Sequence, residues 1–227
     1  MQPYVFPYLG YYQLIKAVDK FVMYDDVNFI TRGWVNRNNI LVNNKAHLFT
    51  IPLKDSSQNR PIRDISVAVD RSWTKKILKT LEHSYKKAPF FEETLSLINN
   101  VFDSSLTHIH QISKRSIFII SRYLDLDSEF VDSSSSYNNY QLKGQERILD
   151  ICRREGADQY VNPIGGQEIY SNVLFENSGI KLNFIKSNAI MYKQFVSEFV
   201  PNLSIIDALM FNSKEEVKEM LDEYELI

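Results

Sequence analysis

The chain has 227 residues, of which 44% are hydrophobic and 24% are charged, and its formal net charge is −2. A chain of this length can bury a proper core, so we expect one domain over residues 1–227. Its small net charge and scattered basic residues provide no field that would attract nucleic acid. There is no leader pattern, no apolar run long enough to span a bilayer, and only one cysteine, Cys152. We therefore expect a cytoplasmic protein with no nucleic-acid partner and no membrane insertion.

Residues 1–70 are expected to form one helix and several short strands. Residues 10–18 have the apolar spacing of a helix, and a short strand follows at 21–24. Residues 40–42 and 48–53 flank an Asn-Asn pair, which predicts a hairpin because asparagine tolerates positive φ. Residues 62–69 alternate between apolar and polar side chains, as a strand does.

Residues 72–124 are expected to be helical throughout. Ser72 is a suitable N-cap for the first helix, and Pro89 ends it. Two more helices are expected at 91–102 and 106–124. We interpret this stretch as a helical insertion that lies over the rest of the domain as a lid.

The remainder of the chain alternates between strands and helices. The expected strands are 129–132, 160–161 and 180–185, and the expected helices are 144–155, 166–175, 203–210 and 214–224. This alternation predicts an α/β fold in which helices flank a parallel sheet, as in Rossmann-like proteins.

The first 40 residues carry the strongest functional signal. Pro3 and Pro7 stiffen a loop that is rich in tyrosine, and a dense group of Trp, Asn and Arg follows the next strand. A structural interpretation is that the aromatic rings pack in the core and that the acids cap a turn. However, many polar groups of different kinds in one segment favour a binding site for a polar small molecule. The candidate binding residues here are Gln2, Tyr4, Tyr8, Gly10, Tyr11, Asn28, Trp34, Asn36, Arg37 and Asn38.

Asp25 and Asp26 end the strand at 21–24 and are the candidate catalytic residues. Adjacent residues of a strand project to opposite sides, so the two acids cannot form one acid–base dyad unless the backbone turns between them. We expect one to act as a base, a cation ligand or a hydroxyl acceptor, and the other to be structural. None of the histidines has metal-ligand spacing, so we expect no metal site.

Three segments follow strands of the expected parallel sheet, at 25–28, 132–136 and 162–166. Ligands bind beyond the carboxyl ends of such strands, so we expect the three segments to converge at one edge. Ser134 is a binding candidate on this ground, although the serine run 133–136 could instead be a linker.

Four more candidates depend on weaker patterns. Asn162 and Gly165 precede a helix whose free N–H groups could bind an anion, or they form a plain turn. Lys143 and Arg147 are one helical turn apart and could face a phosphate, or they belong to a solvated helix face.

A set of motifs runs along nearly the whole chain, in residues 1–15 (MQPYVFPYLGYYQLI), 21–29 (FVMYDDVNF), 34–38 (WVNRN), 85–90, 156–160 and 203–209. The set resembles the WbqC-like protein family. The resemblance implies a role in bacterial surface polysaccharide (O-antigen) biosynthesis, as a glycine or other aminoacyl transferase that acts on a nucleotide-linked amino sugar. Such a substrate would need cations for its diphosphate and aromatic rings for stacking. No cofactor is identified.

Two other functions remain open. Tyr8-Leu9-Gly10-Tyr11 lies where nucleotidyltransferases carry a His-x-Gly-His signature, but tyrosine cannot carry the positive charge with which histidine stabilises a polyphosphate. The chain also lacks an unambiguous nucleophile or base, which keeps open a non-catalytic module that binds a sugar nucleotide.

Overall fold

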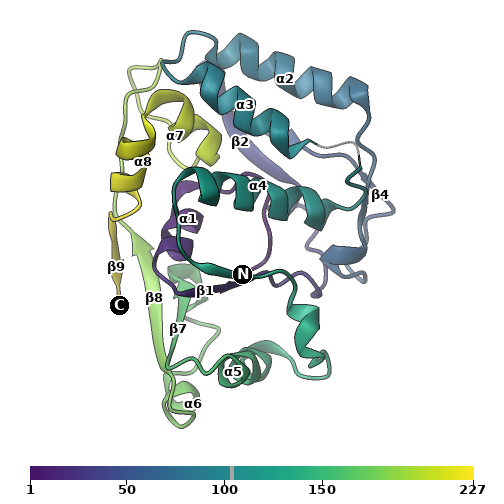
Figure 1. Ribbon diagram of the computed structural model, residues 1–227, viewed down its shortest axis with the longest axis vertical. Coiled ribbons are helices and arrows are strands. Elements are labelled where there is room, and N and C mark those ends of the chain that lie inside the picture. Colours follow the sequence, from purple (N-terminus) through teal and green to yellow (C-terminus); the bar gives the residue numbers. More distant parts are fainter. Residues whose placement is uncertain (103–104) are drawn as a thin grey trace.

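The computed structural model describes residues 1–102 and 105–227 and has a mixed α/β fold (Figure 1). Strands β1 (Lys20–Val22) and β6 (Glu129–Val131) pair in parallel, with Phe21 opposite Phe130. A second parallel pair joins β7 (Gln159–Pro163) to β8 (Lys181–Ser187). The expectation of parallel strands flanked by helices is thus confirmed, whereas the Rossmann-like topology stays a prediction.

Met1 runs alongside β1 as another parallel strand would. Its backbone nitrogen donates a hydrogen bond of 2.7 Å to the Val22 carbonyl, and the Tyr24 N–H donates one of 2.8 Å to the Met1 carbonyl. The chain then forms a loop and enters α1 (Leu9–Lys16), which packs against β7 and β8. The N-terminal loop is therefore bordered by both parallel pairs.

The hairpin of β2 (Arg37–Val42) and β3 (Lys45–Thr50) turns at the expected Asn-Asn pair. Asn43 and Asn44 have φ of 48° and 63°, and this left-handed conformation matches the twist of a two-residue hairpin turn. Part of the stretch predicted as a strand at 62–69 is instead a 3-10 turn, η1 (Ile62–Asp64). The short strands β4 and β5 pair across this region at Leu53–Lys54 and Ser66–Val67.

The three helices expected at 72–124 are present as α2 (Arg71–Tyr85), α3 (Phe91–Val101) and α4 (Ile109–Tyr123). Helix α2 begins earlier than expected, because the Asp70 side chain, not Ser72, caps it by accepting a 2.7 Å hydrogen bond from the Trp73 N–H. Buried residues of all three helices join the same hydrophobic core as the first 40 residues. The interpretation of these three helices as an inserted lid stays a prediction.

The C-terminal half differs from expectation in two places. The helix predicted at 166–175 is reduced to a 3-10 turn, η3 (Ile164–Gly166), and one turn of helix, α6 (Asn172–Glu176). A final strand, β9 (Tyr224–Leu226), was not predicted and pairs antiparallel with β8. The remaining elements are η2 (Ser134–Tyr137), α5 (Gly144–Arg154), α7 (Ile205–Phe211) and α8 (Lys214–Met220).

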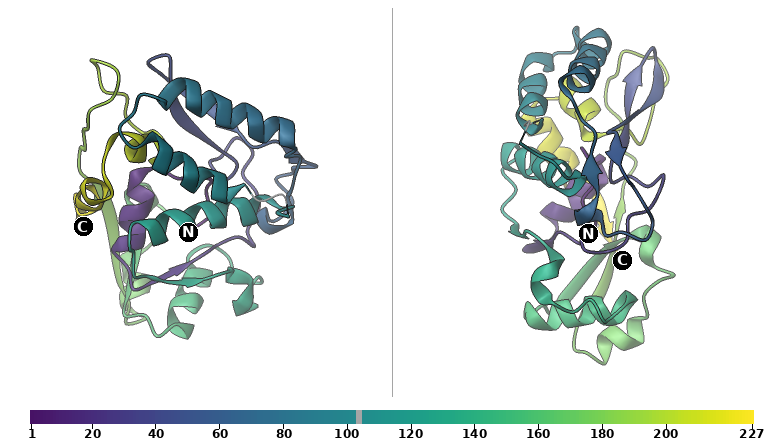
Figure 2. Two further views of the ribbon diagram at one scale, coloured as in Figure 1. Left: turned by 45° about the horizontal axis from the view of Figure 1, so that its top comes forward. Right: turned by 90° about the vertical axis from the view of Figure 1, so that its right-hand side faces the viewer.

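Helices α5 and α6 lie at the end of the molecule opposite α2 (Figures 1 and 2). They enclose a small core of their own, formed by Leu149, Cys152, Phe175 and Ile180, and the main core fills the rest. Helix α4 lies on one side of β1 and α5 on the other, so the end of β1 is flanked from both sides. In residues 1–102 and 105–227, no helix is both long and apolar enough to cross a membrane.

Candidate functional site

Asp25 is buried directly beyond the end of β1, with 1% of its surface exposed. Its Oδ2 lies 3.4 Å from the Lys114 ammonium on α4, and its Oδ1 accepts a 2.6 Å hydrogen bond from the Ser133 hydroxyl. A buried carboxylate is costly unless it is paired and hydrogen-bonded, and Asp25 is both.

Asp26 has a matching set of partners on the other side. Its Oδ2 accepts a 2.6 Å hydrogen bond from Arg147 on α5, and its Oδ1 accepts one from the Ser134 hydroxyl. Arg147 is only 4% exposed, and its guanidinium carbon lies 4.9 Å from the centre of the Tyr24 ring. Two segments expected to converge, 25–28 and 132–136, are thus joined by direct hydrogen bonds.

Lys114 belongs to this cluster but was not a candidate from the sequence. Its ammonium donates to the carbonyl of Asp132 at 2.8 Å and lies 3.1 Å from the Asp132 carboxylate, besides its contact with Asp25. The sequence offered only the position of this lysine beside the apolar stripe of α4; in the structure 8% of its side chain is exposed. From helical periodicity alone, a lysine at this position is expected to be solvated. The carboxylates that pair with Lys114 follow strands that are distant in the sequence, so the periodicity of α4 does not reveal them.

The N-terminal loop is held in a strained conformation by buried side chains. Phe6 has φ of 41°, which is unusual for a bulky residue. Its N–H donates to the Ser116 hydroxyl at 2.9 Å, and its carbonyl accepts from Asn38 and Ser204 at 2.7 Å each. Such strain persists only where the surrounding structure fixes it, and it is typical of functional sites.

Two amides proposed as binding groups donate to the backbone. Asn38 donates to the loop carbonyls of Val5 and Phe6, and Asn36 donates to the Ile51 carbonyl at 2.9 Å. Both asparagines are more than nine-tenths buried. Their side chains therefore shape the loop and the start of the hairpin.

The tyrosines of the loop differ in access. Tyr11 is buried and donates a 2.8 Å hydrogen bond to the Gln2 carbonyl, and burial raises its pKa well above the usual value. Tyr4 is partly buried, with its ring 5.8 Å from that of Tyr11, whereas Tyr8 is 38% exposed. Of these rings, Tyr8 is the one best placed to touch a ligand.

Gly10 is needed for close packing at the start of α1. A Cβ there would lie 2.7 Å from the Ser187 hydroxyl oxygen and 2.8 Å from the Tyr8 ring. The absence of a side chain at Gly10 allows the first turn of α1 to pack against the end of β8. The N-terminal loop therefore lies beside the end of β8 as well as the end of β1.

Trp34 and Arg37 form a pair before and at the start of β2, in which Trp34 is exposed and Arg37 is half-buried. The guanidinium carbon lies 5.8 Å from the centre of the indole ring, and its Nε donates to the Gly33 carbonyl at 2.9 Å. Trp34 is 44% exposed, and Asn28 is also exposed. In the described part of the chain Arg37 forms no ion pair, so it does not bind Asp25 or Asp26, whose cations are Lys114 and Arg147.

The remaining candidates form no direct hydrogen bond to Asp25 or Asp26 among the described residues. Asn162 donates to the Tyr160 hydroxyl at 2.8 Å, and no hydrogen bond links it to Asp25 or Asp26 among the described residues. Gly165 and Lys143 are exposed, and a Cβ on Gly165 would meet nothing within 4 Å.

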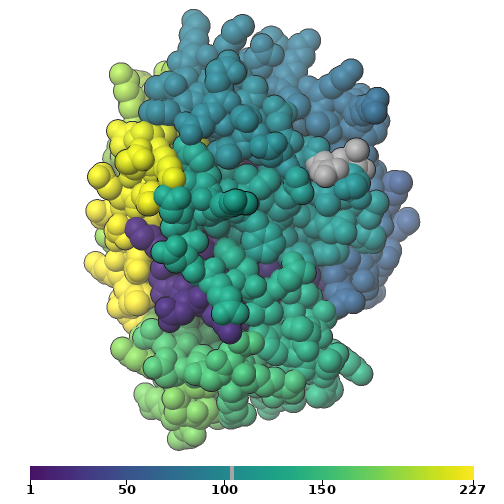
Figure 3. Space-filling view, in the orientation of Figure 1, coloured from purple at the N-terminus to yellow at the C-terminus, as the bar shows by residue number. Residues whose placement is uncertain are grey.

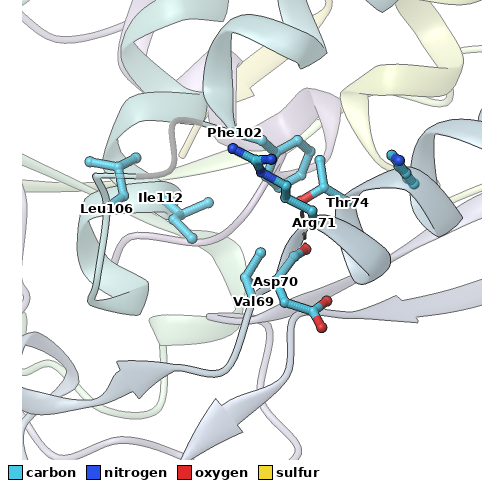
Figure 4. Close-up of a pocket in the computed structure, with 8 residues that line it drawn as sticks. Val69, Asp70, Arg71, Thr74, Phe102, Leu106 and Ile112 are labelled. Atoms are coloured by element: carbon cyan, nitrogen blue, oxygen red, sulfur yellow. Dashed lines mark hydrogen bonds between the residues drawn. The ribbon is translucent and has the colours of Figure 1, made fainter.

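Two surface pockets lie elsewhere. One of about 360 Å³ opens at the start of α2, with an apolar floor and charged side chains at its rim (Figure 4). Its lining residues are Val69, Asp70, Arg71, Thr74, Lys75, Phe102, Leu106 and Ile112. Another of about 380 Å³ lies beside the end of α2. Neither pocket is lined by any of the first 40 residues.

The N-terminal segment nevertheless reaches the surface between the C-terminal residues and those around α5 and α6 (Figure 3). No group of three His, Cys, Asp or Glu side chains suited to a metal ion occurs among the described residues. The site offers hydrogen-bond donors, acceptors, cations and aromatic rings from its own side chains.

Comparison with known proteins extends over almost the entire chain. The model of the WbqC-like protein family matches residues 2–219. The uncharacterised protein Rv1507c of Mycobacterium tuberculosis is 26% identical over 220 residues, which cover 95% of this chain and 93% of that protein. No solved structure matches the chain.

Proposed function

Because the chain belongs to the WbqC-like protein family, we propose that it is a transferase of bacterial surface polysaccharide (O-antigen) biosynthesis. The proposed reaction moves an activated acyl or aminoacyl group, such as glycyl, to the amine of a nucleotide-linked amino sugar. The proposal places the protein in the cytoplasm, where nucleotide-linked sugars are the activated precursors.

The observation that carries this proposal is the polar cluster at the end of the parallel pair β1–β6. Asp25 and Asp26 are fixed there by Lys114 and Arg147 beside a rigid, strained loop. Ligand sites of α/β proteins lie beyond the carboxyl ends of parallel strands, and catalytic groups need rigid support. A cluster of this kind suits a substrate with many hydroxyl groups.

Trp34 and Arg37 suit the nucleotide part of such a substrate. An exposed indole offers a stacking surface for a base or sugar ring. The guanidinium beside it uses only its Nε in a hydrogen bond among the described residues, so its two terminal nitrogens are available for a diphosphate.

Nucleotidyl transfer is less well supported. Tyr11 occupies the second histidine position of the signature discussed above, and its hydroxyl is buried against the Gln2 carbonyl. A side chain committed in this way cannot contact the phosphates of a nucleoside triphosphate.

A thermal-shift screen tests the proposal. A ligand that binds only the folded state raises Tm, so nucleotide-linked amino sugars should stabilise the protein. Nucleoside triphosphates and free amino sugars are the comparison ligands. Mass spectrometry of reactions with activated acyl and aminoacyl esters should then show the sugar nucleotide gaining one acyl group. Stabilisation by triphosphates alone would instead favour the nucleotidyltransferase alternative.

A further inference from the structure

His110 lies in the first turn of α4, one helical turn before Lys114. Its Nδ1 is buried and has no hydrogen-bond partner among residues 1–102 and 105–227. Its Nε2 also forms no hydrogen bond to these residues, but it is not one of the buried unpartnered atoms, so it reaches the surface. A buried polar atom without a partner is rare in a folded protein and is often retained for a chemical role.

The charged and titratable groups near His110 come from both sides of the acid cluster. Lys114 and His108 lie on the same helix, Asp25 follows β1, and Asp132 follows β6. The side chain of Asp132 is 76% exposed, so this side of the cluster is open to a ligand. From η1, which packs against α4, Arg63 and Asp64 form their own ion pair of 3.8 Å.

Burial lowers the pKa of His110 below its usual value of 6.5, and the positive charge of Lys114 lowers it further. The ring is therefore neutral at pH 7, with one nitrogen free to accept a proton. His108 provides a contrast, because its Nδ1 is 2.9 Å from the Thr107 hydroxyl and thus has a partner.

We propose that His110 accepts the proton from the sugar amine during acyl transfer, an inference that rests on the function proposed above. The amine nitrogen attacks the carbonyl carbon of an activated acyl or aminoacyl ester, and the new C–N bond forms. The C–O bond to the leaving alcohol then breaks, and the leaving oxygen takes the electron pair. His110 takes the amine proton on Nε2 and passes it to that oxygen, which returns the ring to its neutral state.

The test compares His110→Gln with His108→Gln, whose ring centre in the wild type lies 5.9 Å from that of His110. We expect His110→Gln to lower kcat by about 100-fold or more, with KM changed less than threefold, because general base catalysis contributes on this scale. His108→Gln should stay within about threefold of the wild type. The wild-type rate should fall in acid as His110 is protonated, and His110→Gln should lose this dependence.

A second readout does not depend on turnover. Binding of the nucleotide-linked amino sugar should shift the NMR signals of the His110 ring and should leave those of His83, on α2, in place. Turnover by the wild type with an equal rate in His110→Gln would overturn the role of His110 and leave the proposed function standing. Absence of both sugar-nucleotide binding and turnover in the wild type would overturn the proposed function and the role of His110 with it.

Discussion

Asp25 and Asp26 are adjacent in the chain, yet their carboxylates bind cations from helices on opposite sides of β1. Lys114 on α4 lies 3.4 Å from Asp25, and Arg147 on α5 lies 2.6 Å from Asp26. Each acid also accepts a hydrogen bond from its own serine beyond β6. This division follows from the alternation of side chains along an extended chain, and it means that the two acids belong to separate chemical environments.

Lys114→Met should destabilise the protein by about 3–5 kcal/mol, because it leaves the Asp25 carboxylate buried without a cation. Methionine keeps most of the packing volume of lysine, so the loss reports on charge. The free energy of unfolding from urea denaturation measures it. Lys86→Met is the control, since Lys86 and Glu82 form an exposed pair 3.9 Å apart that should contribute only about 0–0.5 kcal/mol. Equal effects of the two substitutions would contradict the buried pair.

Gly10→Ala should cost about 1–3 kcal/mol, because its Cβ would collide with the Ser187 hydroxyl and the Tyr8 ring. Gly165→Ala is the matched control, since its Cβ would meet nothing within 4 Å and should change stability little. Thermal unfolding of both variants measures the difference. If Gly10→Ala were as stable as the control, the first turn of α1 would have to be free to move away from β8.

Titration of Asp207 should increase the free energy of unfolding as the pH falls over part of the acid range. Its carboxylate accepts hydrogen bonds of 2.8, 2.8 and 2.7 Å from Tyr85, Tyr192 and Gln194. Burial nevertheless raises the pKa of Asp207 above its usual value of 3.8, and the hydrogen bonds only oppose this shift. The folded state therefore binds the proton more tightly than the unfolded state does, and the stability gained in this way is lost as pH rises through the raised pKa.

The measurement compares urea unfolding of the wild type and Asp207→Asn at several pH values, because asparagine does not titrate. We expect the stability of the wild type relative to the variant to grow as pH falls from neutral towards 3.8. A relative stability that falls with acid would mean that the hydrogen bonds outweigh burial and hold the pKa of Asp207 below 3.8.

Arg37→Lys should weaken binding of the nucleotide-linked sugar by about 1–3 kcal/mol and leave Tm nearly unchanged, because lysine cannot replace a bidentate guanidinium. Calorimetric titration beside a melting curve separates the two quantities. Arg32→Lys is the control, since Arg32 is exposed in the same loop. A lower Tm with unchanged affinity would make Arg37 a residue that holds the loop through Gly33, and would direct the search for the anion site to the exposed Lys143.

The sequence predicted most elements because their signals are local. The Asn-Asn hairpin, the helices at 91–102 and 144–155 and the strand at 129–132 follow from periodicity and turn chemistry. The last strand, β9, could not be predicted in the same way, because a three-residue strand at a chain end depends on its partner β8.

Residues of the candidate site could be predicted when they follow a strand. They could not be predicted when only tertiary contacts bring them to the site. The position of Asp25 and Asp26 after β1 and of Ser134 after β6 was expected, since strand ends can be read from the sequence. Lys114 and His110 were not expected, because only the packing of α4 across β1 brings them to the acids. Lys114 and Asp25 are 89 residues apart, and no local sequence pattern predicts that two such distant residues come into contact.

The strained loop at Phe6 also bears on how the chain folds. The groups that fix it lie 32, 110 and 198 residues away, at Asn38, Ser116 and Ser204. Loop closure over such separations is entropically costly and slow, so the loop should become ordered only after the hairpin, α4 and the start of α7 are in place. During synthesis, the loop would leave the ribosome well before Ser116 and Ser204, and it would be among the last segments to reach its native conformation. Removal of residues 204–227 should leave the loop disordered.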